Sequence, residues 1–202
     1  MGAKADFESL VIELSQLDSR KQLAFAIFLI ERALPAFYAF QIETGHQGGG
    51  CLRAALGQFW SILELGSVSG HRFVTLETCE SVIPDSEDYG SPYTSASIDA
   101  GAIVCSTFDL IDGHDPEALR AMIQARQDSV DLFLRNREDF PGSGADVFHG
   151  DTMQHPLMEE ELALMQADVR FLRLADSEKA DFFSSVLRRV RELDYGRLRL
   201  HA

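Results

Sequence analysis

Positive charge is scarce in this chain. Its 202 residues include 18 Lys and Arg against 32 Asp and Glu, which gives a net charge of −14. A protein that binds a nucleic-acid backbone needs a cationic surface to displace counterions from the phosphates. The charge balance therefore argues against a nucleic-acid partner. A local group of arginines near the C-terminus is interpreted as favourable charge at the end of a helix: Arg188, Arg189, Arg191, Arg197 and Arg199.

Cysteine is also sparse. Cys51, Cys79 and Cys105 are far apart, odd in number and never in the Cys-x-x-Cys spacing of zinc and redox sites. Each lies in a largely apolar, helical context, which predicts buried and reduced thiols in a cytoplasmic protein. The first residues contain no apolar signal core, so we expect no secretory leader.

Motifs of the common enzyme classes are missing. The run Gly48–Gly50 begins like a dinucleotide fingerprint, but Arg53 occupies its last glycine position and no strand precedes it. A nucleophile-elbow frame carries Val68 in place of serine. A calcium-loop frame carries Tyr89 and Ala96 at two ligand positions. The sequence therefore indicates no cofactor site and leaves the question of enzymatic activity open.

Strand signals are missing too, because no stretch alternates with β-branched enrichment and no Asn-Gly or Asp-Gly turn joins two such runs. Apolar residues instead recur at helical spacing in seven or eight segments. The sequence predicts an all-α fold, a single helical-bundle-like domain over residues 1–202. The expected helices cover residues 6–16, 19–43, 51–65, 72–83, 94–112, 115–137, a segment from 156 onward, and 177–194, of which the last two could join.

The most apolar stretch is Leu23–Phe40, which is apolar on every side of a helical wheel. Such a helix is either a buried central helix or a membrane span. Glu31, Arg32 and Pro35 lie near its centre, and a central charge costs about 2.5–3.5 kcal/mol on the insertion scale. We therefore expect the core helix of a soluble protein and no membrane partner. Pro35 is expected to kink or interrupt it.

Charged residues inside apolar helices need partners, because an unpaired buried ion costs several kcal/mol. Glu31, Arg32 and Asp99 are three such residues. The simplest pairing joins Arg32 to Asp99, with Arg53 as a reserve cation. The alternative is a buried polar pocket formed by the same four residues, which would bind a small molecule. The sequence leaves both alternatives open.

A weak metal-site candidate lies in the longest expected loop, residues 140–155. His149, Asp151 and His155 fall within seven residues, and imidazole and carboxylate groups are suitable ligands for zinc or a similar divalent ion. The same pattern also fits a solvated polar loop in which His155 caps the next helix.

Three blocks of residues carry a family resemblance. The most specific contains Ile83–Pro84, Asp88 and Ile98–Asp99–Ala100. Taken together, the blocks resemble the YjaG-like family of bacterial proteins, a domain of unknown function. That family often has Tyr-Gly-x-Tyr-Pro-Ala before the Asp-Ala pair, where this chain has residues 93–97 with a different sequence. The other two blocks run from Lys21 to Leu63, around Glu31–Arg32 and Trp60, and from His155 to Gln166.

The resemblance implies a single all-helical domain of bacterial, cytoplasmic origin, and it implies no activity. The leading hypothesis is therefore a non-enzymatic binding or interaction protein that works as a homo-oligomer or with a protein partner. The alternative is a metal-dependent hydrolase or small-molecule-binding enzyme that uses the His149–His155 loop or the region of Asp88 and Asp99.

Overall fold

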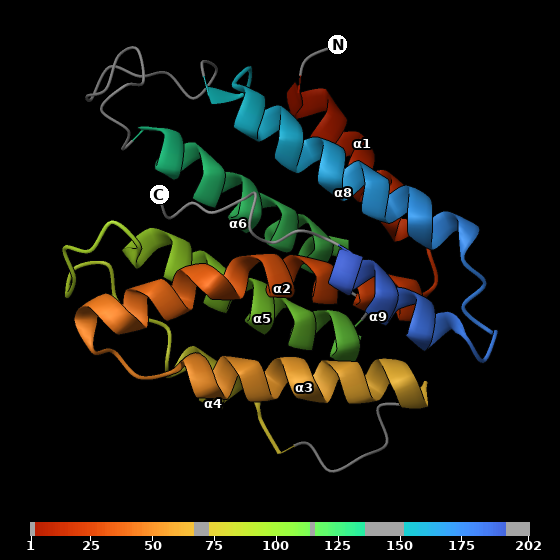
Figure 1. Cartoon of the computed structure of the whole chain (residues 1–202), viewed down its shortest axis with the longest axis horizontal. Coiled ribbons are helices and arrows are strands. Elements are labelled where there is room, and N and C mark those ends of the chain that lie inside the picture. The colour runs from red at the N-terminus through yellow and green to blue at the C-terminus, as the bar shows by residue number, and fades with distance from the viewer. Residues whose placement is uncertain (1–2, 67–72, 114–115, 136–151, 193–202) are drawn as a thin grey trace.

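The computed structural model describes residues 3–66, 73–113, 116–135 and 152–192. Within these ranges the chain forms eight helices and no strand, which confirms the predicted all-α class (Figure 1). The helices pack into one bundle-like domain. They are α1 (Ala3–Ser15), α2 (Ser19–Thr44), α3 (Gly49–Leu65), α4 (Leu76–Glu80), α5 (Thr94–Gly113), α6 (Pro116–Arg135), α8 (Pro156–Leu174) and α9 (Phe182–Glu192).

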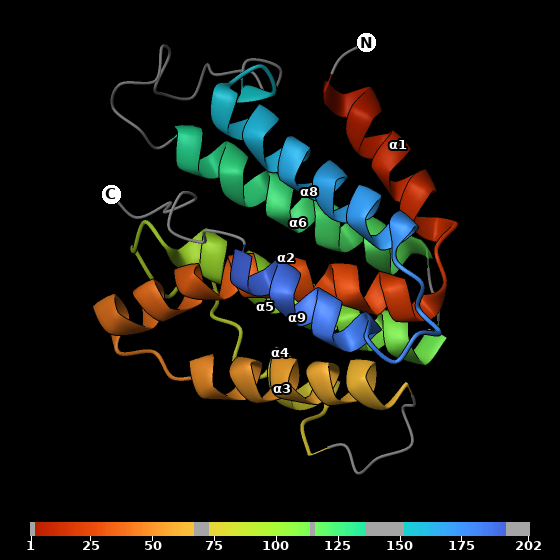
Figure 2. The ribbon, with the colours of Figure 1, turned by 45° about the vertical axis from the view of Figure 1, so that its right-hand side comes forward.

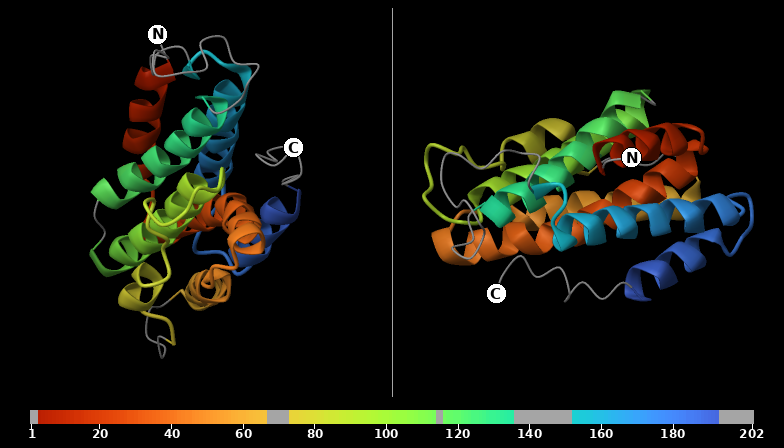
Figure 3. Two further views of the ribbon diagram at one scale, coloured as in Figure 1. Left: turned by 90° about the vertical axis from the view of Figure 1, so that its left-hand side faces the viewer. Right: turned by 90° about the horizontal axis from the view of Figure 1, so that it is seen from above.

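The bundle is organised around α2. Every side chain from Gln22 to Ile30 is buried, a pattern typical of a helix that is enclosed on all sides. Helices α3, α5, α6, α8 and α9 all contact α2, and Figure 3 shows it running through the middle of the domain. By length and composition α2 is also apolar enough to cross a membrane, but its neighbours bury most of that apolar segment.

Helix α2 continues through Pro35 as one element, so the expected interruption does not occur. Pro35 lies on the exposed side of the helix, where water can satisfy the carbonyl group that loses its helical donor. The helix starts at residue 19, as expected, and ends at Thr44, one residue after the expected end. Asp18 caps the N-terminus by accepting a hydrogen bond from the Lys21 amide at 3.0 Å, and Gly45 ends the helix in the left-handed conformation with φ 75°.

The turn between α2 and α3 is packed against the segment that follows α4. His46 Nε2 lies 2.8 Å from the Val82 carbonyl oxygen, so Nε2 carries the proton, and Nδ1 accepts from the Tyr89 hydroxyl at 3.0 Å. Gly48 has φ 156°, and a Cβ atom there would lie 2.8 Å from the Val82 Cβ and 3.1 Å from the Phe37 ring. Glycine is therefore required where these segments meet.

Two helical boundaries differ from the sequence prediction. Helix α4 is much shorter than residues 72–83, because Thr75 caps its start by accepting from the Thr78 amide at 3.2 Å. The last helix, α9, begins at Phe182 and not at residue 177; α8 and α9 are separate, which is one of the two expected alternatives, and Figure 2 shows the turn of residues 175–181 between them.

Candidate functional site

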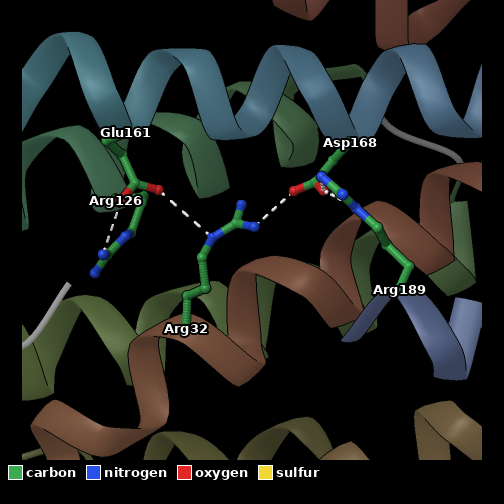
Figure 4. A network of polar contacts seen from close by, with 5 residues as sticks. All are labelled: Arg32, Arg126, Glu161, Asp168 and Arg189. Atoms are coloured by element: carbon green, nitrogen blue, oxygen red, sulfur yellow. Dashed lines mark hydrogen bonds and ion pairs between the residues drawn. The ribbon is translucent and has the colours of Figure 1, made fainter. Parts of the chain in front are cut away.

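Arg32 projects from the buried side of α2 toward α8. Its Nη1 donates a hydrogen bond to Asp168 Oδ2 at 2.6 Å, and its Nε lies 3.6 Å from Glu161 Oε1 (Figure 4). Glu161 and Asp168 are seven residues apart, which places them on one face of α8 two turns from each other. Arg32 therefore bridges two carboxylates of the same helix.

Two further arginines complete this network. From α6, Arg126 Nη2 donates to Glu161 Oε2 at 2.9 Å. From α9, Arg189 donates to Asp168 Oδ1 through Nε at 3.1 Å and through Nη2 at 2.9 Å. The network thus connects α2, α6, α8 and α9 through charged side chains, four of which lie in the interior.

The electrostatics of the network favour fixed charges. Burial raises the pKa of Glu161, but the nearby Arg126 and Arg32 guanidinium groups more than offset this, and the net effect lowers the pKa. Arginine itself does not release its proton in proteins. These groups therefore hold their charges and stabilise the packing of four helices, and they are poorly suited to transferring a proton during a reaction.

Asp99, on α5, has partners different from those expected. Its Oδ2 accepts a hydrogen bond from Ser129 Oγ of α6 at 2.7 Å. Burial raises its pKa to about 6; the Ser129 hydrogen bond opposes that shift, the Asp128 charge adds to it and the Arg126 charge opposes it. The expected Arg32–Asp99 pairing is therefore replaced: Arg32 binds α8 and Asp99 binds α6.

Glu31 and Arg53 form a third, separate group. Glu31 Oε2 lies 3.2 Å from Arg53 Nη1, and Glu31 Oε1 accepts from the Trp60 indole at 3.2 Å. The Arg53 side chain is 58% exposed, so this pair links α2 to α3 near the surface. The four residues proposed for one polar pocket are thus distributed over three different sets of contacts.

Of the candidate metal ligands, His149 and Asp151 lie outside the described residues. His155 is described, and its Nδ1 accepts a hydrogen bond from the Leu157 amide at 3.2 Å, which caps α8. Asp88 lies exposed in the turn after α4, where its amide donates to the Asp85 carbonyl oxygen at 3.3 Å. Across the part of the chain that the structure describes, no three His, Cys, Asp or Glu side chains are grouped as metal ligands.

A small pocket of about 250 Å³ lies between α1 and α6. Its buried apolar walls come from Phe7, Val11 and Ile123, and at its edge Glu8 pairs with Arg120 Nη1 at 2.6 Å. The full lining consists of Phe7, Glu8, Val11, Arg120, Ile123, Gln124, Gln127 and Met153.

Sequence reasoning missed both Glu161 and Asp168. Neither residue is among the buried charges that the sequence analysis identifies. The available signal was their position, because both lie within the stripe of buried residues formed by Met158, Leu162 and Met165. The pocket had no signal in the sequence, because its walls come from helices far apart along the chain.

The comparisons with known proteins give a family and a fold. Residues 10–196 match the family model described as "Protein of unknown function (DUF416)". The crystal structure of a DUF416 family protein from Shewanella baltica OS155 is similar, with a TM-score of 0.73 and 19% sequence identity. That match covers 90% of this chain and 93% of the other. No curated protein matches the chain.

Proposed function

We propose that this chain, which belongs to the DUF416 family of proteins of unknown function, is a non-enzymatic cytoplasmic protein that associates with a second copy of itself through α1 and α6. The observation that carries the proposal is the position of Ile12 beside the pocket between these helices. Ile12 is 58% exposed and lies on α1, four residues after Glu8, which lines that pocket. An exposed apolar side chain of α1 therefore lies close to a pocket whose buried walls are apolar and whose edge is polar.

This arrangement suits a two-fold interface. In an isologous dimer each copy offers the same surface, so an exposed side chain of one copy can fill the pocket of the other, and the reverse holds. The volume of about 250 Å³ is below the roughly 300–1,000 Å³ usual for small-molecule sites. It is better matched to an anchoring side chain, the kind of contact that dominates protein interfaces.

The charged edge of the pocket supports the same proposal. Glu8 and Arg120 have side chains that are 52% and 42% exposed, and they carry opposite charges. Glu8 and Arg120 pair within one copy, and across a two-fold axis the same pair of the second copy can lie beside them with opposite charges facing, which gives electrostatic complementarity between two identical surfaces.

We propose that the protein is not an enzyme because its buried carboxylates already have partners within the fold. Glu161 and Asp168 are already engaged by arginines, and Asp99 accepts a hydrogen bond from Ser129. We also propose that the chain is YjaG-like within this family, a resemblance that assigns no activity of its own.

Light scattering after size exclusion tests the proposal. We expect the wild-type chain to show twice its own mass of 22.5 kDa, and Ile12→Glu to show the single mass, because a buried charge opposes association. Ile42→Glu is the matched control, since Ile42 is 85% exposed on the last turn of α2. Figure 1 shows that this end of α2 lies away from α1. A wild type that is monomeric at about 100 μM contradicts the proposal, because a dissociation constant above that concentration corresponds to a binding free energy of less than roughly 5.5 kcal/mol. An Ile12→Glu variant that stays dimeric contradicts it as well.

A further inference from the structure

The three cysteines, far apart in the sequence, come from three neighbouring helices. Cys51 is in the first turn of α3, Cys79 is in α4 and Cys105 is in α5. The Cys51 and Cys79 sulfur atoms lie 4.0 Å apart. Cys51 and Cys105 are partly exposed, whereas Cys79 is fully buried. One accessible thiol therefore lies directly beside one protected thiol.

The separation of the two sulfur atoms is close to that needed for a bond. A disulfide has a sulfur–sulfur length of about 2.05 Å, so the gap must close by roughly 2 Å. The Cys51 thiol already points toward α4, because it also lies 3.8 Å from the Thr78 carbonyl oxygen. Helix α4 has only five residues and is followed by a turn, so it is the element best able to adjust.

We propose that Cys51 and Cys79 form a peroxide-driven disulfide, with Cys51 as the thiol that reacts first and Cys79 as the resolving thiol. In the first step the Cys51 thiol and a hydroperoxide ROOH give the sulfenic acid and ROH. In the second step the Cys79 sulfur attacks the Cys51 sulfur, and the sulfenic hydroxyl leaves as water with the Cys79 proton. The peroxide is reduced by two electrons and the two thiols are oxidised to one disulfide.

Geometry assigns the partner of Cys51. Burial raises the pKa of Cys79 and also the pKa of Cys105, so both thiols are held in the protonated, less nucleophilic form and acidity does not choose between them. The Cys79 sulfur lies 4.0 Å from the Cys51 sulfur, where it can attack a sulfenic acid formed there. The disulfide is therefore assigned to Cys51 and Cys79 from this contact.

The disulfide would hold α4 against the start of α3. The turn that follows α4 already contacts the α2–α3 turn through Val82 and His46. The bond would therefore fix a junction that is otherwise held by hydrogen bonds and packing. Because it closes a loop of 28 residues in the unfolded chain, we expect oxidation to raise the melting temperature by about 5 °C or more.

Mass spectrometry of the full chain tests the proposal. Reduced protein is treated with hydrogen peroxide, remaining thiols are alkylated, and the disulfide is mapped with a protease that cleaves after glutamate. Trypsin is unsuitable because no Lys or Arg lies between Phe73 and Leu119, so Cys79 and Cys105 stay on one peptide. We expect a Cys51–Cys79 link that dithiothreitol reverses, in the wild type and equally in Cys105→Ser.

The single variants separate the two roles. In Cys79→Ser the sulfenic acid at Cys51 should persist and react with a 1,3-dione probe, whereas Cys51→Ser should form no disulfide. Three outcomes would overturn the proposal: a link that involves Cys105, an intermolecular link through Cys51, or direct over-oxidation of Cys51 to the sulfinic acid in the wild type. A circular dichroism spectrum of each variant checks that it is folded.

Discussion

Arg32 and Asp168 lie 2.6 Å apart, from Nη1 to Oδ2, although 136 residues separate them in the sequence. This contact joins the central helix α2 to α8, and Arg189 of α9 binds the other oxygen of the same carboxylate. Both Arg32 and Asp168 are buried. Because a charge in the interior is stable only with its partner, the contact makes the position of α8 depend on α2.

Replacing Asp168 with Asn is expected to destabilise the fold by about 3–5 kcal/mol, because Arg32 then remains buried without its main counter-charge. The measurement is urea unfolding followed by circular dichroism. The control is Glu13→Gln, which removes an exposed pair with Arg173 whose atoms lie 3.0 Å apart and should cost about 1 kcal/mol or less. Equal losses of unfolding free energy in the two variants would show that the buried pair contributes no more to stability than the exposed pair does.

Asp99 should make stability depend on pH. Its pKa is about 6 in the folded protein against an ordinary value of 3.8, so the folded protein binds this proton more tightly than the unfolded chain does. The stabilisation from this group is fully present below about pH 4 and is lost as the pH rises through about 6. Asp99→Asn stays neutral and can still accept the Ser129 hydrogen bond. We expect its stability relative to the wild type to increase by about 2 kcal/mol between pH 4 and pH 7.

The matched control for that titration is Asp128→Asn, since Asp128 is exposed and acts on Asp99 only as a nearby like charge. Its stability relative to the wild type should change much less over the same pH range. A flat difference between wild type and Asp99→Asn would show that Asp99 has an ordinary pKa.

Two glycines inside helices should respond in opposite ways to alanine. Gly57 in α3 has no atom within 4 Å of its missing Cβ, so Gly57→Ala should stabilise by about 0.5–1 kcal/mol through helix propensity. At Gly101 in α5 the new Cβ would lie 2.6 Å from Ile83 Cγ1, so Gly101→Ala should cost about 1–3 kcal/mol. Thermal and urea unfolding measure both changes.

A rescue tests the cause of the Gly101 effect. The substitution Ile83→Ala removes every side-chain carbon beyond Cβ. The remaining Cβ lies 3.6 Å from the Cβ that Gly101→Ala adds, which is an ordinary contact distance. The cost of Gly101→Ala should therefore be smaller in an Ile83→Ala background than in the wild type, and an unchanged cost would rule out this steric contact.

His155 should matter as a helix cap. His155→Ala removes the acceptor for the Leu157 amide and is expected to cost about 1 kcal/mol. His155→Asn should restore most of that stability, because asparagine is a favourable N-cap residue. The unfolding curves are recorded with and without a chelator. A loss that occurs only when metal is present, or that Asn does not restore, would favour the alternative role of His155 as a metal ligand.

The sequence alone determined the helical class and much of the helix layout. Apolar spacing locates helices wherever burial is one-sided, and local chemistry sets several ends: Asp18 begins α2 and the glycines at 45 and 66 end α2 and α3. The central helix α2 was identified by a different pattern, an unbroken apolar run that is typical of a helix buried on all sides. The start of α4 was placed too early because the apolar pattern does not show that Thr75 caps the helix.

Only the tertiary structure decided which charges meet. Arg32 was recognised as a buried ion, yet a sequence does not specify which of 32 acidic residues will face it. The choice of Asp168 over Asp99 depends on how α8 lies across α2, which is fixed by the summed packing of all the helices. The gathering of the three cysteines and the pocket between α1 and α6 arise in the same way, since both are made of side chains that only the packed fold brings together.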